Sequence, residues 1–405
     1  MRRGMILICC MLMCCCVGCS NTKQEVNVDA EIQDIDVASC LAGDNAFDDK
    51  GFYHIMGHDM KYVGEDGQIQ ALYQVDQASI LVCALYHQDV LYTAINSGSV
   101  QNGVSVETNK IERWNAETKK MESVVEQKMA DDEWTSTIFS MAAAGNFLYY
   151  VVDSATNEKI EVDGNEHYAQ TSAVYRVDLT TGKQEKIYEI EPNDEHFSNL
   201  LVMVDGDYQD TDSITLMNRY SPKMSPGESY TDFYTLDLSK NKIKKIEDVK
   251  FDFTVDMACQ YQNRIYYSDE TGENTEFNYI DLDTKEITSV FDMDGYGYLY
   301  QDYISLWSSG EDSRNYLYSY KDGKLYVSKE SLAKSARVVG VGDKYLAIDE
   351  RDYTNVTEQT EDIGIYKAVD KTSYIAEYYT EYHGESADGL TYYGPEGKKI
   401  SESEK

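Results

Sequence analysis

Two short runs of acidic residues have the types and spacing that could bind a hard cation. The first contains Asp205, Asp207, Asp210 and Asp212, and the second spans residues 161–166. Carboxylate oxygens at this density are the ligands that Ca²⁺ takes in proteins. Neither run has the twelve-residue spacing of the helix–loop–helix calcium site, and Asp-Gly pairs are also common in turns. We therefore expect no cofactor other than Ca²⁺, and the alternative is that both runs are ordinary turns.

The spacings typical of common catalytic sites are absent from the sequence. It has no Gly-x-Ser-x-Gly, no His-Glu-x-x-His, no phosphate-binding loop and no dinucleotide-binding fingerprint. His54 and His58 are four residues apart, but their surroundings favour a strand and a turn, so the two rings need not face one metal. We assign no catalytic residue, although 72 acidic residues would hide a catalytic carboxylate pair.

Charge excludes one class of partner. The chain has 36 basic and 72 acidic residues among 405, which gives a formal net charge of −36. A surface of this sign repels nucleic acid, so we exclude DNA or RNA as a partner. A hydrophobic content of 42% and 35 tyrosines nevertheless supply enough apolar surface for a folded core.

The first residues have the composition of an export signal. Two arginines precede an apolar run at residues 5–17, which is too short to span a bilayer and is followed by Gly18, Cys19, Ser20 and Asn21. These residues resemble a bacterial lipoprotein signal, although Cys16 stands where that signal usually has leucine. The resemblance implies cleavage before Cys19, a diacylglycerol and a palmitate on Cys19, and a protein anchored to the extracytoplasmic side of the cell membrane.

Three cysteines remain in the body of the chain, at Cys40, Cys83 and Cys259. Their wide spacing allows at most one disulfide and matches no zinc site. We expect each to be a small buried residue.

A repeat occupies most of the chain. Four segments align around Asn115, Asp178, Asp237 and Asp281, with spacings of 63, 59 and 44 residues. Residues before each aligned position alternate between apolar and polar, as in a half-buried strand, and a second strand follows a short turn. The aligned Asp or Asn is predicted to cap this turn, and residues such as Gly182 supply its left-handed position.

Two further strands precede each hairpin. A turn residue followed by an aromatic or β-branched run recurs at residues 89–94, 146–151, 263–268 and 343–348, after a smoother apolar stretch. Repeated four-stranded units of this length predict an all-β fold, a β-propeller of about seven blades, with six or eight left open. The body resembles bacterial propeller lipoproteins of the quinoprotein-like and TolB-like kind, many of which are described only as domains of unknown function.

The predicted organisation has four parts. Residues 1–18 form the signal peptide, residues 19–30 a flexible tether, residues 31–380 the propeller, and residues 381–405 a polar tail with room for a short extra hairpin.

Insertions between the second and third strand of each unit mark the predicted binding face. Such connections emerge on one face of a propeller, and variable loops on a rigid scaffold often carry function. The candidate residues on this face are Glu161, Asp163, Asp269, Glu270, Glu273, Arg351, Asp352 and Tyr353.

Tyrosines form a second candidate surface. Most of them should pack between blades, with the hydroxyl reaching water at a rim. Tyr296, Tyr298, Tyr300 and Tyr303 could instead make a platform on which a sugar or peptide stacks.

Three functional hypotheses remain. The leading one is a lipid-anchored propeller without enzymatic activity, which binds an envelope protein or a polysaccharide. The second is a propeller enzyme such as a glycoside hydrolase. The third, a solute-binding lipoprotein of a transporter, needs two α/β lobes, against which the strand pattern argues.

Overall fold

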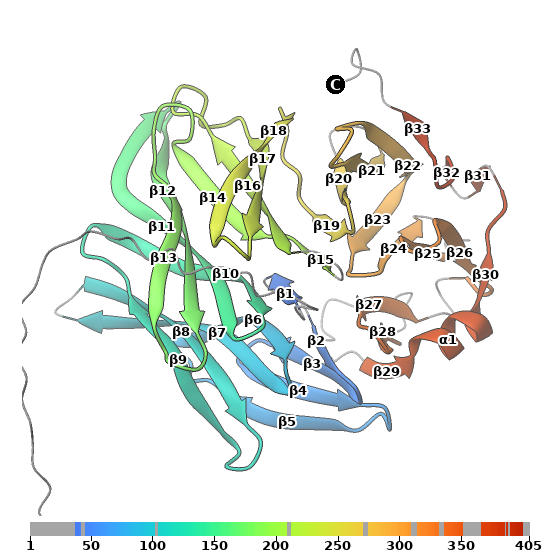
Figure 1. The fold of residues 1–405 in the computed structure, drawn as a ribbon, viewed down its shortest axis with the longest axis horizontal. Coiled ribbons are helices and arrows are strands. Elements are labelled where there is room, and N and C mark those ends of the chain that lie inside the picture. Colours follow the sequence, from blue (N-terminus) through green and yellow to red (C-terminus); the bar gives the residue numbers. More distant parts are fainter. Residues whose placement is uncertain are drawn as a thin grey trace, which may run out of the picture. The chain divides into compact units, whose positions relative to one another are not determined.

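The computed structural model describes residues 37–41, 45–101, 104–208, 212–269, 274–308, 314–331, 336–350, 366–384, 386–387 and 389–399. Cys19 and the predicted signal and tether lie outside these residues. The described part is nearly all strand, and its helix is α1 (Lys371–Tyr378). Seven small sheets stand around a central axis, which confirms the predicted β-propeller and fixes the blade number at seven (Figure 1).

Each blade begins with its innermost strand and proceeds outward. Blade 1 contains β2 (Ala46–Asp48), β3 (Gly51–Met56), β4 (Asp59–Gly64) and β5 (Ile69–Gln74). Blade 2 contains β6 (Ser79–His87), β7 (Val90–Gln101), β8 (Val104–Asn115) and β9 (Lys120–Lys128). Blade 3 contains β10 (Glu133–Ala144), β11 (Phe147–Val162), β12 (Asn165–Asp178) and β13 (Gln184–Ile190). Blade 4 contains β14 (Ser198–Met203), β16 (Ser213–Ser221), β17 (Tyr230–Asp237) and β18 (Lys242–Phe251).

The last three blades have shorter strands, and C-terminal strands extend blades 5 and 6 at their outer edges. Blade 5 contains β19 (Ala258–Tyr261), β20 (Arg264–Asp269), β21 (Thr275–Asp281) and β22 (Ile287–Met293), and β31 (Ser386–Ala387), β32 (Leu390–Tyr392) and β33 (Lys398–Lys399) extend it. Blade 6 contains β23 (Gly295–Leu299), β24 (Tyr303–Ser308), β25 (Asn315–Ser319) and β26 (Lys324–Ser328), with β30 (Tyr379–Glu381) outside. Blade 7 contains β27 (Arg337–Val341), β28 (Tyr345–Asp349) and β29 (Tyr366–Asp370).

Antiparallel pairing gives the ring two different faces. Connections from the first to the second strand, and from the third to the fourth, emerge at one end, which we call the turn face. Connections from the second to the third strand, and from one blade to the next, emerge at the other end, which we call the loop face. The turn between His87 and Val90 lies on the turn face, and the hairpin between Val162 and Asn165 lies on the loop face.

The aligned Asp and Asn residues cap their turns as predicted. The side-chain oxygen of Asp178 accepts hydrogen bonds from the backbone N–H groups of Thr180 and Thr181 at 2.8 and 3.0 Å, and Gly182 has a φ of 72°. These N–H groups lower the pKa of the Asp178 carboxyl because they favour its charged form. Asn115, Asp237 and Asp281 accept equivalent hydrogen bonds in blades 2, 4 and 5.

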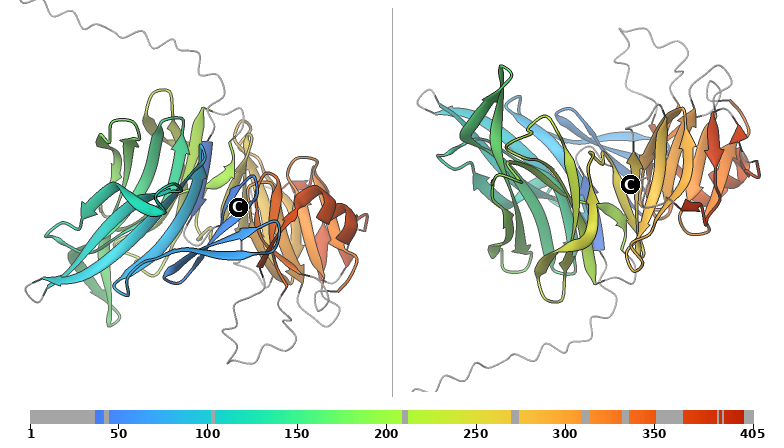
Figure 2. Two further views of the ribbon diagram at one scale, coloured as in Figure 1. Left: turned by 90° about the horizontal axis from the view of Figure 1, so that it is seen from below. Right: turned by 90° about the horizontal axis from the view of Figure 1, so that it is seen from above.

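Two of the predicted insertions are paired strands instead of irregular loops. In blade 2 the ladder between β7 and β8 continues to the pair Gln101–Val104, and in blade 3 the ladder between β11 and β12 continues to Val162–Asn165. Each pair therefore projects from the loop face as a two-stranded arm. Figure 2 shows how much longer the strands of blades 2 and 3 are than those of blades 5–7.

Two short strands that the sequence pattern did not indicate lie inside the ring. β1 (Val37–Leu41) pairs antiparallel with the inner strand β10, and β15 (Asp205–Asp207) pairs parallel with the inner strand β19 (Figure 1). The Ser39 hydroxyl donates a hydrogen bond of 2.8 Å to Asp205 Oδ1, which joins the two strands. β15 approaches β19 so closely that a Cβ on Gly206 would lie 2.2 Å from the Gln260 carbonyl oxygen, so only glycine fits there.

Most of the core lies between neighbouring blades. Cys40, Cys83 and Cys259 are buried within it, as predicted, and they form no disulfide with one another. His54 and His58 bond separately, to the Asn45 side chain and the Ser79 carbonyl, each at 2.7 Å. Among the described residues, no helix has the length and apolarity to cross a membrane.

Side-chain packing, without a shared strand, closes the ring between blades 7 and 1. Phe52 and Val63 of blade 1 pack against Tyr345, Ala347 and Ala368 of blade 7. The Tyr345 hydroxyl donates a hydrogen bond to the Glu65 carboxylate, and Lys344 Nζ donates one to the Asp49 carbonyl at 3.3 Å. The seam depends on such side-chain contacts because no ladder between described strands crosses it, and the chain continues from β29 into α1.

The first prediction concerns this seam. A Cβ on Gly342 would lie 2.4 Å from the ring of Phe47 in blade 1, so Gly342→Ala forces the two blades apart. We expect the free energy of unfolding in urea to fall by about 1–3 kcal/mol, as for other overpacked cores. Gly227→Ala is the control, because a Cβ there meets nothing within 4 Å, and equal stability of the two variants would contradict the seam's importance.

Candidate functional site

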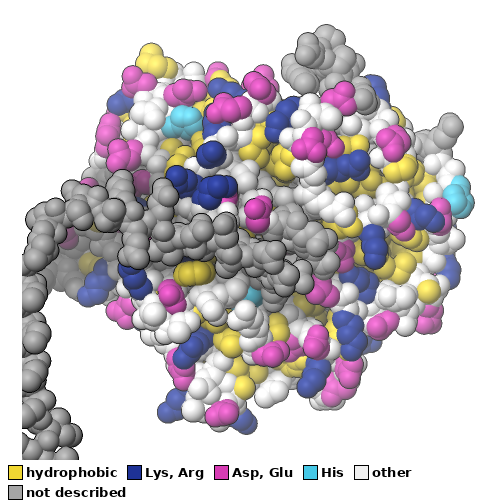
Figure 3. All heavy atoms as spheres, in the orientation of Figure 1, with side chains coloured by type: hydrophobic (Ala, Val, Ile, Leu, Met, Phe, Trp, Pro, Cys, Tyr) yellow, Lys and Arg dark blue, Asp and Glu magenta, His cyan; other side chains and the backbone are white. Residues whose placement is uncertain are grey.

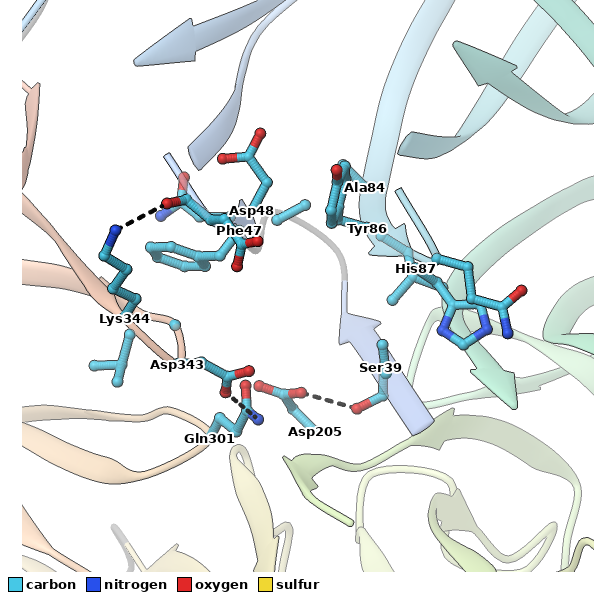
Figure 4. Close-up of a pocket in the computed structure, with 18 of the residues that line it drawn as sticks. Ser39, Phe47, Asp48, Ala84, Tyr86, His87, Asp205, Gln301, Asp343 and Lys344 are labelled. Atoms are coloured by element: carbon cyan, nitrogen blue, oxygen red, sulfur yellow. Dashed lines mark hydrogen bonds between the residues drawn. The ribbon is translucent and has the colours of Figure 1, made fainter. Parts of the chain in front are cut away.

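A cavity of about 380 Å³ opens at the centre of the turn face. Turns after the first strands of blades 1, 2, 6 and 7 line it, together with β1 and β15. Figure 4 shows Asp205, Asp343 and Gln301 close together on one side, with Lys344 at the rim. The Gln301 amide donates a hydrogen bond of 3.3 Å to Asp343 Oδ1. The first-to-second strand turns and the two inner strands thus converge on one space.

Aspartates dominate the charge of this cavity. Its lining contains one lysine, Lys344, and five aspartates: Asp48, Asp49, Asp89, Asp205 and Asp343. Acidic and basic side chains are interspersed around the rim of the face drawn in Figure 3, so this concentration differs from the general surface. Carboxylates gathered in a concave site focus a negative potential, which attracts cationic groups.

Asp205 is the carboxylate deepest in the ring. Desolvation raises its pKa, the hydrogen bonds from the Ser39 hydroxyl and the Gly206 N–H partly oppose this, and the charge of Asp302 raises the pKa further. Asp302 itself forms an ion pair with Lys371. A cation entering the cavity would favour the charged form of Asp205 and so oppose this rise in its pKa.

A larger groove of about 650 Å³ lies beside the cavity, between blades 1 and 2. Tyr53, Tyr62, Tyr86 and Trp114 give it an aromatic lining, with Arg113 and Glu122 among its polar residues. Tyr86 and Asp89 line both spaces, so the groove and the cavity adjoin. We call the two together the turn-face site.

Asp48 links the two halves of the turn-face site. Its carboxylate accepts hydrogen bonds of 3.0 Å from the hydroxyls of both Tyr53 and Tyr62, which orients these rings. The rings of Tyr53 and Tyr86 stack at 5.6 Å between centroids. Desolvation and then the charge of Asp48 raise the pKa of Tyr86 to about 12, so its hydroxyl remains a hydrogen-bond donor at neutral pH.

The predicted calcium residues are not gathered as one described cluster. Asp205 lies in the cavity, Asp212 is exposed near β16, and Asp210 and the side chain of Asp207 lie outside the described residues. No group of three or more His, Cys, Asp or Glu residues in the described part could hold a metal ion. Calcium binding by this run stays a prediction.

The predicted binding residues that the structure describes lie on the opposite end of the ring from the turn-face site. Glu161 and Asp163 are exposed at the tip of the β11–β12 arm, and Asp269 is half-buried at the end of β20. Glu270, Glu273, Arg351, Asp352 and Tyr353 lie outside the described residues. Among the predicted tyrosines, Tyr296 and Tyr298 are exposed on β23, whereas Tyr300 and Tyr303 are partly buried nearer the turn face.

The turn-face site is not among the sites predicted from the sequence, although the sequence contains a signal for it. Asp89 and Asp343 were recognised only as turn residues that precede a second strand. Both recur at the same position of their repeats, and this register brings them to the mouth of the channel. A residue type that recurs at one position of several blades is therefore a candidate for a site at the centre of the ring.

The fold and this site define the chain as a seven-bladed β-propeller with an acidic cavity at one end of its channel. No protein-family model and no curated protein sequence matches it.

Solved propeller structures are similar to the chain at low scores. TolB from Acinetobacter baumannii is 12% identical with a TM-score of 0.34, and the match covers 73% of this chain and 64% of that one. The β-propeller domain of the Trilobed protease from Pyrococcus furiosus is 10% identical with a TM-score of 0.36, covering 69% and 93%. An acylaminoacyl peptidase is 12% identical with a TM-score of 0.42, covering 68% and 43%. None of these scores supports an argument about activity.

The second prediction tests the junction of β1 and β15 at the cavity floor. Ser39→Ala removes the hydrogen bond to Asp205, so we expect amide hydrogen exchange in β1 to accelerate about fivefold, as for the loss of roughly 1 kcal/mol. Ser99→Ala is the matched control, since its hydroxyl bonds the Val106 carbonyl in the distant β7–β8 arm. Unchanged exchange in β1 would show that the backbone ladder to β10 holds this strand alone.

Proposed function

We propose that this chain is a lipid-anchored propeller on the extracytoplasmic side of the cell membrane, which binds a cationic segment of an envelope protein at the turn-face site. The observation that carries the proposal is the convergence of five aspartates and one lysine on a central cavity. It is a binding function, without an assigned chemical step.

Charge selects the first part of the ligand. A lysine or arginine side chain entering the cavity would meet Asp48, Asp89, Asp205 and Asp343, and among the described lining residues only Lys344 is a lysine or arginine. The net charge of −36 extends this attraction beyond contact distance and speeds the encounter with a basic partner. Anionic ligands are disfavoured for the same reason.

The aromatic groove selects the second part of the ligand. Tyr53, Tyr86 and Trp114 offer apolar ring surface, and tyrosine and tryptophan supply much of the binding energy in protein interfaces. Because the groove adjoins the cavity, an extended peptide could place an apolar side chain between blades 1 and 2 and a neighbouring basic one at the centre. The ligand is thus a segment with basic and apolar residues side by side.

The position of the first described strand indicates which face of the ring an anchor on Cys19 would hold near the membrane. Val37 pairs with Ala144 at the end of β10, so the chain enters the ring from the turn face. Cys19 precedes Val37 by 18 residues, a stretch that reaches at most roughly 60 Å when extended. A lipid on Cys19 would keep the turn-face site within this distance of the membrane and of partners embedded in it.

The third prediction is binding of a basic, phenylalanine-containing peptide to the turn-face site. We expect the double variant Asp89→Asn, Asp343→Asn to weaken binding of a fluorescent peptide with two arginines beside a phenylalanine by about tenfold, equivalent to about 1.4 kcal/mol. Fluorescence anisotropy at two ionic strengths measures this, and wild-type affinity should fall with added salt because the attraction is screened.

The control for this experiment lies on the loop face. Glu161→Gln, Asp163→Asn removes the same charge from the tip of the β11–β12 arm and should leave the affinity unchanged. Weaker binding in the control with no change in the cavity variant would move the binding surface to the loop face. A peptide with glutamates in place of the arginines should not bind.

The fourth prediction concerns the anchor. In a bacterial host, wild-type protein should incorporate labelled palmitate and partition with membranes, whereas Cys19→Ser should lose both properties. Cys14→Ser is the control, since it removes a neighbouring thiol outside the residues that resemble the cleavage box and keeps Cys19. Labelling that persists in Cys19→Ser would refute this anchor without affecting the peptide-binding proposal.

A further inference from the structure

Two exposed tyrosines lie together on the inner strand of blade 6. Tyr296 is 67% exposed and Tyr298 is 49% exposed, although both belong to β23, an innermost strand. Tyr296 pairs across the ladder with Trp307 of β24, and the Trp307 ring lies 6.3 Å from Tyr296 and 5.5 Å from Tyr298 between centroids. We call these three residues the aromatic platform.

Gly297 explains why the two tyrosines share one side of β23. A Cβ on Gly297 would lie 2.6 Å from the ring of Phe277 and 2.4 Å from Leu306, so this residue packs tightly towards blade 5. Neighbours in a strand point the opposite way, which directs Tyr296 and Tyr298 towards blade 7. Blade 7 leaves about half or more of each ring exposed, and the apolar cluster that joins blades 6 and 7 contains neither tyrosine.

The platform belongs to the loop-face half of the ring. Tyr296 is near the start of a first strand and Trp307 is near the end of a second strand, and both positions lie towards the loop face. The turn-face site opens at the other end of the channel, and β1 and β15 lie inside the ring. The two sites can therefore bind different ligands.

We propose that the aromatic platform binds an uncharged polysaccharide by stacking sugar rings on Tyr296, Tyr298 and Trp307. A pyranose ring has an apolar C–H face and a hydroxylated edge. A tyrosine ring with its hydroxyl, or an indole, offers a matching apolar face with a polar edge. Residues two apart on a strand are about 6.6 Å apart, which is comparable with the repeat of a sugar chain.

Charge points to a neutral ligand. Arg337 lies over the Trp307 ring at 5.0 Å, and the strand register pairs its backbone with that of Asp349, so one basic and one acidic residue stand together on this side of blade 7. A polyanion would also meet the repulsion of a chain with a net charge of −36. A cationic segment would be attracted more strongly to the aspartates of the turn-face site than to the platform. Charge complementarity therefore favours an uncharged sugar chain.

The fifth prediction is measured by calorimetry on the full chain, with linear hexasaccharides of glucose and of N-acetylglucosamine as probes. We expect at least one of them to bind, and Tyr296→Ala and Tyr298→Ala each to weaken its affinity at least tenfold. Tyr378→Ala is the matched control, because Tyr378 is 46% exposed on the distant helix α1. All three variants remove a ring that is about half exposed or more, so their circular dichroism should match the wild type.

The outcomes also separate this proposal from the turn-face proposal. Added salt should not change the affinity for the sugar, and Tyr296→Ala should still bind the basic peptide. The platform proposal fails if neither hexasaccharide binds at millimolar concentration, if the two platform variants bind as the wild type does, or if Tyr378→Ala weakens binding equally. A preference for a hexasaccharide of galacturonate would likewise overturn the choice of a neutral ligand.

Discussion

The burial of both faces of every blade against its neighbours is the constraint on which this structure depends. A four-stranded sheet of this size has apolar side chains on both faces and cannot cover them alone, so the blades must surround an axis. The last contact is the most demanding one, because the chain runs from blade 7 into α1 and does not connect blade 7 directly to blade 1. There Phe52, Val63 and Tyr345 replace a backbone ladder with side-chain packing, and this contact brings the turn of Asp343 and Lys344 beside that of Asp48 and Asp49.

Ring closure also gives the channel two ends of different chemistry. Short turns bring aspartates to one end, where β1 and β15 add Ser39 and Asp205. At the other end, the inner strand of blade 6 presents tyrosine rings that blade 7 does not cover. Electrostatic attraction would select ligands at the first end, and ring stacking at the second. A binding protein with two such ends could hold two components of an envelope together.

Much of the fold could be read from local patterns. Asn115, Asp178, Asp237 and Asp281 mark the same turn in four blades, because an Asx side chain caps a turn through residues two and three positions away. Hydrogen bonds between residues so close in sequence leave a pattern of residue types that can be recognised when the unit is repeated. The position of β15 and the closure of the ring could not be predicted from the sequence, because both depend on residues far apart along the chain. Ser39 and Asp205, which join β1 to β15, are 166 positions apart. The turn-face site was the hardest feature to predict. The sequence around Asp89 and Asp343 has the pattern of a turn, and only the closed ring brings the two residues together.

The sequence by itself determined the all-β class, the repeat, the turn chemistry and the buried cysteines, because strand alternation and capping depend on near neighbours along the chain. The tertiary structure alone decided the blade number, the seam between blades 7 and 1, the strands inside the channel and the residues that meet at each of its ends. These features depend on how the blades pack around a common axis, and that packing brings together side chains whose separation along the chain has no local pattern.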